Sequence, residues 1–128
     1  MNRETEKMLR IDIQSWNDVA TLRCSGRVVF GVETEMLRTM VLSRPEACVR
    51  IILARVDQID ASGLGLLVEL QAWARETKRG LVLLDLSEQV WALVILTKLC
   101  GSLEISYSDV AAAFDGKENE FCRRKLIA

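Results

Sequence analysis

An apolar strand pattern that leads directly into a helix start restricts the fold of this chain more than any other feature. Residues 48–56 form an apolar run rich in β-branched side chains, which predicts an inner strand of a sheet. The turn Asp-Ala-Ser-Gly-Leu-Gly at 60–65 follows, and a helical spacing of apolar residues then continues to Arg79. A buried strand that feeds a helix through so short a turn is typical of the crossover connections in an α/β fold.

The same alternation of strand and helix patterns runs along the rest of the chain. Residues 8–13 and 19–24 alternate between apolar and polar side chains, and the turn signal Asn17-Asp18 between them predicts a β-hairpin. The further predicted elements are helices at 32–42, 87–99 and 108–114 and strands at 81–86 and 103–107.

These patterns predict one α/β domain over residues 8–114 and a C-terminal tail at 115–128. The element order is ββαβαβαβα, with a mixed sheet of about four or five strands flanked by about four helices. Gly80 and Gly101 mark the predicted ends of the second and third helices. In the first helix, Val32 is expected on the buried face and Glu33 on the solvent face.

Composition excludes several functional classes. The 128 residues suffice for one domain that buries a core without metal or disulfide. The 17 basic and 18 acidic residues are too evenly balanced for a nucleic-acid-binding module. The absence of histidine removes imidazole zinc sites and Ser-His-Asp triads, and the 4 cysteines contain no CxxC pair. We expect neither a metal nor a cofactor.

No segment of the sequence has the pattern of a targeting or membrane signal. The N-terminus is charged and lacks the apolar centre of a signal peptide. The longest uninterrupted apolar stretch, residues 91–96, is far too short to cross a bilayer. A cytoplasmic protein without membrane insertion is therefore expected. The same stretch is apolar almost all round its predicted helix, so a partner, a second copy in a homodimer or the C-terminal tail is expected to cover part of it.

The turn at 60–65 has the chemistry of a helix N-terminus. Asp60 can accept hydrogen bonds from the free N–H groups of the first helical turn, and its charge suits the positive end of the helix dipole. Gly63 and Gly65 leave room for a close approach of helix and strand backbones. Spacing alone favours a well-capped structural helix. A hydroxyl in this turn, once phosphorylated, would instead place a dianion at a helix N-terminus, which receives anions readily.

The sequence Ile-Asp-Ala-Ser-Gly-Leu-Gly-Leu-Leu-Val at 59–68 resembles the signature of STAS domains, the family of anti-sigma-factor antagonists and sulfate-transporter tails. The resemblance covers about residues 8–114 and includes Gly26 after the second strand and the helix start Ser87-x-x-Val90. It implies the fold predicted above and a protein-binding role. In family members that switch sigma factors, a kinase-type anti-sigma factor phosphorylates a Ser or Thr directly after the motif aspartate.

This sequence departs from the family pattern at that acceptor position. Ala61 occupies it and has no hydroxyl, which leaves Ser62 as the candidate phosphorylation site. A shift of one residue turns a helical side chain by about 100°, so a kinase aligned on the first position need not reach Ser62. Arg27 stands where the family often has an acidic residue, and Leu53-Ala54 replaces a polar residue of the third strand. The protein is either phosphorylated at Ser62 or held in the unphosphorylated, binding-competent form, and the second is favoured.

The resemblance implies a regulatory module that binds a kinase-type anti-sigma factor. The alternative is a STAS subunit of a transporter or larger signalling complex that acts without phosphorylation. An enzyme is disfavoured, because Asp57 and Asp60 need not converge and no base for a serine nucleophile is evident.

Leu64 and Val68 are placed on a helix face apart from the buried stripe, either as contacts for the partner or as incidental exposed aliphatic side chains. The expected partner-binding residues are Asp60, Ala61, Ser62, Gly63, Leu64 and Val68.

Overall fold

The computed structural model describes residues 9–107. It contains a five-stranded sheet with the order β1-β2-β3-β4-β5. The strands are β1 (Arg10–Trp16), β2 (Val19–Val28), β3 (Cys48–Ile59), β4 (Gly80–Leu84) and β5 (Ile105–Ser106). The helices are α2 (Val32–Leu42), α3 (Ala61–Glu76) and α4 (Glu88–Thr97), with a 3-10 turn η1 (Cys100–Ser102). The predicted α/β fold and element order are confirmed over this range. The predicted helix at 108–114 and the tail at 115–128 lie outside the described residues.

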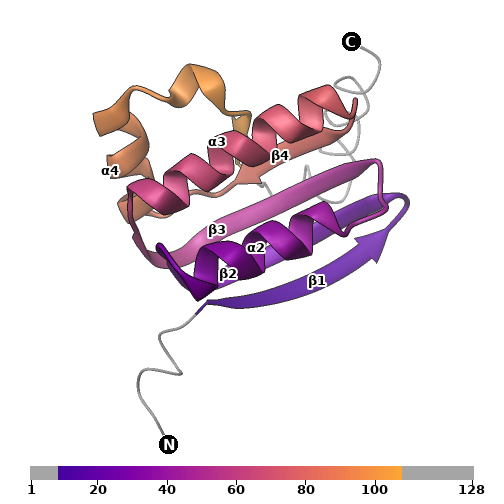
Figure 1. Cartoon of the computed structure of the whole chain (residues 1–128), viewed down its shortest axis with the longest axis horizontal. Coiled ribbons are helices and arrows are strands. Elements are labelled where there is room, and N and C mark those ends of the chain that lie inside the picture. The colour runs from indigo at the N-terminus through magenta and orange to yellow at the C-terminus, as the bar shows by residue number, and fades with distance from the viewer. Residues whose placement is uncertain (1–8, 108–128) are drawn as a thin grey trace, which may run out of the picture.

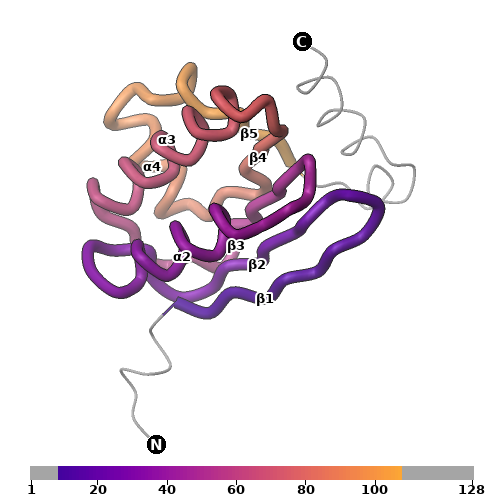
Figure 2. The backbone as a smooth tube through the Cα atoms, turned by 45° about the vertical axis from the view of Figure 1, so that its right-hand side comes forward, coloured from indigo at the N-terminus to yellow at the C-terminus, as the bar shows by residue number. Residues whose placement is uncertain are grey.

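One hairpin and a series of crossovers build the sheet. β1 pairs with β2 in antiparallel orientation, and β2, β3, β4 and β5 pair in parallel. Asn17 and Asp18 both adopt positive φ in the hairpin turn, which confirms the predicted turn. α2 and α3 lie side by side against the sheet (Figures 1 and 2). The carboxyl ends of β2 and β3 therefore lie next to the amino ends of α2 and α3.

The main core lies between the helices and one face of the sheet. Alternate residues of β2, β3 and β4 point into it, and α3 contributes a stripe of leucines. Leu66, Leu67 and Leu70 are almost completely buried. Full burial of one such side chain stabilises the fold by about 1.5–3 kcal/mol, so this stripe fixes α3 firmly on the sheet.

Two helices end earlier than predicted. α3 ends at Glu76 and α4 at Thr97. Lys78 and Lys98 adopt the left-handed backbone conformation, with φ of 58° and 59°, and the chain turns away there. Glycine is the usual residue at such a helix end, so a lysine in this conformation gives no signal in the sequence. The prediction that Gly80 and Gly101 end these helices is therefore wrong.

The start of α3 is in direct contact with the end of β2. A Cβ atom on Gly63 would lie 2.1 Å from the carbonyl oxygen of Val28 and 3.0 Å from Cγ1 of Ile59. Only glycine permits this approach, which confirms the prediction for Gly63. The corresponding prediction for Gly65 is wrong, because Gly65 is exposed and a Cβ there would meet nothing within 4 Å.

Gly63→Ala and Gly65→Ala are expected to change stability in opposite directions. The methyl group at position 63 must displace backbone, and overpacking of this kind lowers the free energy of unfolding by about 1–3 kcal/mol. At position 65 the methyl group meets nothing, and alanine is favoured over glycine in a helix by about 0.8–1.0 kcal/mol. Urea denaturation of both variants measures the difference. An unchanged stability of Gly63→Ala would contradict the close contact.

Candidate functional site

Asp60 ties the start of α3 to the turn that follows β2. It is the N-cap residue of α3, and its Oδ1 accepts a hydrogen bond from the backbone N–H of Gly63 at 2.8 Å. Its Oδ2 accepts a second hydrogen bond, at 3.0 Å, from the backbone N–H of Phe30. The first bond is the helix cap expected from the sequence. The second bond could not be predicted from the local sequence, because Phe30 and Asp60 are far apart in the chain. It holds the turn between β2 and α2 against the first turn of α3.

The first turn of α3 divides between solvent and core. Ala61 and Ser62 are exposed, whereas Gly63 is buried against β2. Leu64 is only 2% exposed and belongs to the main core. The prediction that Leu64 faces a partner is wrong. Leu64 precedes Leu67 by three residues, and residues at this spacing share one face of a helix, which is here the buried face.

Val68 is packed against the core and only partly accessible. Asp60 is also partly accessible. The surface that the structure offers at this turn therefore consists of Ala61, Ser62 and Gly65, with smaller contributions from Asp60 and Val68.

An ion pair shapes the β2–α2 turn. Nε of Arg27 donates to Oε2 of Glu33 at 3.0 Å, and the side chain of Glu33 is 6% exposed. Val32, the residue before Glu33, is 65% exposed. The prediction that Val32 is buried and Glu33 is exposed is therefore wrong, because the structure shows the opposite arrangement. Helical spacing could not reveal this, because Glu33 is drawn inward by a charged partner on the preceding strand.

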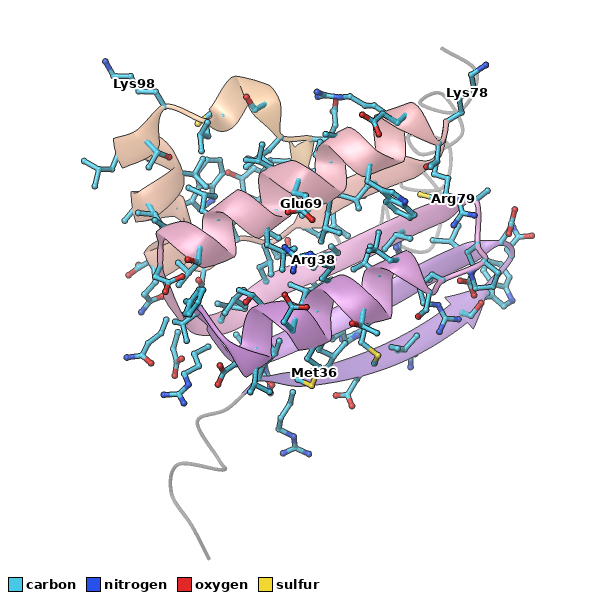
Figure 3. All side chains as sticks on the ribbon, viewed as in Figure 1. Met36, Arg38, Glu69, Lys78, Arg79 and Lys98 are labelled. Atoms are coloured by element: carbon cyan, nitrogen blue, oxygen red, sulfur yellow. The ribbon has the colours of Figure 1, made fainter. Side chains whose placement is uncertain are left out.

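Exposed apolar side chains flank the turn on the side of α2. Phe30 is 79% exposed, and together with Val32 it borders an apolar surface hollow of about 750 Å³. Met36 and Met40 also line this hollow, and Figure 3 shows Met36 on the side of α2 toward β1. Clustered exposed apolar side chains mark interaction surfaces. Sequence reasoning missed Phe30 and Val32; the available signal was an apolar pair around Gly31 directly after a strand.

A smaller and more polar cleft lies on the other side of the turn. It encloses about 400 Å³ and is lined by Arg27, Val29, Asp57, Gln58, Ile59 and Gln89. Asp57 is exposed, and both oxygens of Asp60 accept hydrogen bonds from backbone N–H groups, so Asp60 acts as a structural cap. Among residues 9–107, no group of three or more His, Cys, Asp or Glu side chains could hold a metal ion. Within the same range, every helix is too short or too polar to span a membrane.

A two-point ion pair joins α2 to α3. Arg38 of α2 donates to Glu69 of α3 through Nε at 2.9 Å and Nη2 at 3.0 Å (Figure 3). This hydrogen bonding lowers the pKa of Glu69 and raises the pKa of Arg38. A bidentate contact constrains orientation as well as distance, so the pair links the middle of α2 to the middle of α3 on the exposed side of the two helices.

Asp60→Ala is expected to lower the free energy of unfolding by about 1–2 kcal/mol, because it removes the helix cap and the hydrogen bond to Phe30. Asp57→Ala is the matched control, since Asp57 is an exposed carboxylate on the same strand-to-turn segment. The control is expected to change stability by no more than about 0.5 kcal/mol. Chemical denaturation measures the free energy of unfolding of both variants. An equal loss in the two would refute the stabilising role assigned to the hydrogen bonds of Asp60.

No protein-family model and no curated protein matches this sequence. Solved structures do match, in 26 chains. A candidate anti-sigma factor antagonist from Thermotoga maritima has a TM-score of 0.70 and 19% identity, with 82% of this chain and 92% of that chain covered. The anti-sigma factor antagonist SpoIIAA in its unphosphorylated form has a TM-score of 0.67 and 16% identity, with 86% and 97% covered.

The same fold also matches part of a longer chain. SLC26A9 has a TM-score of 0.64 and 16% identity, and the match covers 90% of this chain and 23% of that one. Structural similarity at these low sequence identities establishes the fold alone. The chain has the STAS fold of the anti-sigma factor antagonists, as a single α/β domain.

Proposed function

We propose that this chain is a regulatory protein-interaction module, an anti-sigma factor antagonist that binds a kinase-type anti-sigma factor. The observation that carries the proposal is the exposed pair Ala61 and Ser62, on a turn that Asp60 clamps against Phe30. This turn belongs to a fold shared with anti-sigma factor antagonists, which supports a partner of that class. The proposal includes a location in the cytoplasm, together with such a partner.

The proposed contact surface combines the turn with its apolar flank. The Asp60 hydrogen bond holds the backbone of Phe30 beside the first turn of α3, so a partner that docks on Ser62 also reaches Phe30. Phe30 and Val32 supply exposed apolar area, and aromatic anchors of this kind carry much of the binding free energy in protein interfaces. Because the clamp holds the turn before binding, little ordering is required on association.

The residue at position 61 supports a form that is permanently competent to bind. A phosphate in this turn would add about −1.5 to −2 charges next to Asp60 and would repel an acidic partner surface. Ala61 offers no hydroxyl for such a modification. We propose that the wild-type protein is not phosphorylated by its partner and that binding is controlled elsewhere. The chain itself has no catalytic role in this proposal.

Phe30→Ala is expected to weaken binding to the anti-sigma factor by at least about tenfold, which corresponds to about 1.4 kcal/mol. Trp16→Ala is the matched control, because Trp16 is 75% exposed but lies at the hairpin, at the opposite end of β2. Titration calorimetry with the anti-sigma factor recovered by pull-down from the native host measures both affinities. Equal affinities of the two variants would place the interface elsewhere.

Ala61→Ser is expected to restore the missing acceptor. Incubated with the kinase-type anti-sigma factor and ATP, the variant gains one phosphate on the introduced hydroxyl and releases its partner, whereas the wild-type protein gains none and stays bound. Intact mass and site mapping give the readout. The control Ser62→Ala is expected to gain no phosphate, like the wild-type protein, because it adds no hydroxyl group. A phosphate on Ser62 of the wild-type protein, accompanied by release, would show that the switch has moved by one residue.

A subunit role in a larger signalling or transporter complex is the second candidate. The match to SLC26A9 favours it, because the same fold there forms only part of a much longer chain. Such a subunit would also have no need of an acceptor at position 61. The pull-down separates the two candidates: recovery of an ATP-binding-cassette subunit without an anti-sigma factor would support the second and overturn the first.

A further inference from the structure

The helix α4 exposes apolar side chains on its outer face. Its inner face carries Val90 and Val94, which are fully buried in the main core. On the outer face Ile95 is 63% exposed, Leu96 is 78% exposed, and Ala92 is exposed as well. Ala92 lies three and four residues before the other two, so the three side chains form one continuous surface, here called the α4 patch. A helix at a protein surface normally carries polar side chains on its outer face, and α4 does not.

Polar groups do not interrupt the α4 patch. Residues 90–97 contain no charged side chain. The hydroxyl group of Thr97 donates to a backbone carbonyl group of its own helix at 2.8 Å, so it is turned away from a neighbour. On the amino-terminal side the apolar surface continues through Trp91, one turn before Ile95. Trp91 stacks on the 63% exposed ring of Tyr107, with ring centroids 6.2 Å apart. Contiguous exposed apolar surface of this kind marks an interaction site.

The α4 patch is separate from the surface proposed for the anti-sigma factor. Figure 1 shows α2 and α4 on opposite sides of α3, and α3 contacts both helices. The exposed side chains of Phe30 and Val32 belong to the side of α2. A partner that docks on Phe30 therefore approaches α2, and the α4 patch requires an occupant of its own.

Two opposite charges flank the α4 patch and indicate what that occupant is. Glu88 lies in the first turn of α4, one turn before Ala92, and Lys98 is the C-cap residue at the other end. Both are exposed, and the ion pairs among residues 9–107 include neither of them. Figure 3 shows Lys98 extending outward from the end of α4. The two residues are about 15 Å apart along the helix, so they cannot pair within one chain.

We propose that the α4 patch is a homodimer interface, in which α4 packs antiparallel against α4 of a second copy. A two-fold axis near the middle of the helix places Glu88 of each copy opposite Lys98 of the other. Two ion pairs then flank an apolar centre, an arrangement that fixes orientation and register. Parallel packing would instead set like charges opposite each other. The inference does not rest on the proposed function, because it needs no anti-sigma factor and no phosphorylation.

The centre of the α4 patch suits close packing of two helices. Ala92 is small, so the second helix can approach near the axis, and the larger side chains Ile95 and Leu96 lie one turn away on either copy. One helix from each copy buries less than the about 1,200–2,000 Å² of a standard interface. We therefore expect a weak dimer that forms and dissociates with protein concentration.

Sedimentation equilibrium of the full chain without any partner tests the dimer, from about 1 µM to about 1 mM. Leu96→Ser is expected to raise the dissociation constant of the dimer by at least about tenfold, because each dimer loses two central leucines. Leu42→Ser is the matched control, since Leu42 is an exposed leucine at the end of α2, and its dissociation constant is expected to equal that of wild type. Circular dichroism confirms that both variants are folded.

Two results would overturn the proposal. The first is a wild-type protein that stays monomeric over the whole concentration range. The second is a dimer that Leu96→Ser weakens no more than Leu42→Ser does.

Charge reversal tests the antiparallel arrangement independently. Glu88→Lys and Lys98→Glu each place like charges opposite each other in the dimer, so each is expected to weaken self-association by about fivefold or more at low salt. An equimolar mixture of the two variants is expected to form heterodimers and to recover the wild-type affinity. Parallel packing predicts no loss in either single variant. Single variants that associate as wild type does, or a mixture that stays as weak as its components, would overturn the arrangement.

Discussion

The contact between Gly63 and the carbonyl group of Val28 is the constraint on which the rest of the site depends. Because β2 and β3 are parallel neighbours, the end of β2 arrives beside the start of α3, and the missing side chain at 63 lets the two backbones touch. Asp60 bridges the same two segments through its bonds to Gly63 and Phe30. The close contact at Gly63 and the two hydrogen bonds of Asp60 thus hold the same turn at the start of α3. The positions of the exposed residues in it are set by the backbone and by Asp60.

This arrangement separates the chemistry of the turn from its stability. Ala61 and Ser62 are exposed, and the clamp consists of backbone N–H groups and one carboxylate from other positions. The side chain at position 61 can therefore change the chemistry of the turn without changing its shape. Under the proposed function, Ala61 keeps the docking geometry and leaves no hydroxyl group to be modified at that position.

The parts of the fold that depend on local chemistry could be predicted from the sequence. Asp60 and Ser87 cap α3 and α4 where the pattern placed helix starts. Features that depend on a distant partner could not be predicted, as the burial of Glu33 against Arg27 shows. The misplacement of Leu64 is of another kind, because its spacing within the helix already contained the answer. At the site, the cap was predictable, whereas the apolar flank arises from how the β2–α2 turn is held.

The strand β3 connects the main core to the turn at Asp60. Alternate residues of β3 point toward the helices and join the main core, and the carboxyl end of the strand leads into Asp60. Leu53 and Val56 are fully buried in this core, so the strand is held against the helices close to the residues that precede the turn. A substitution that loosens this packing would therefore reach the turn through the strand that positions Asp60.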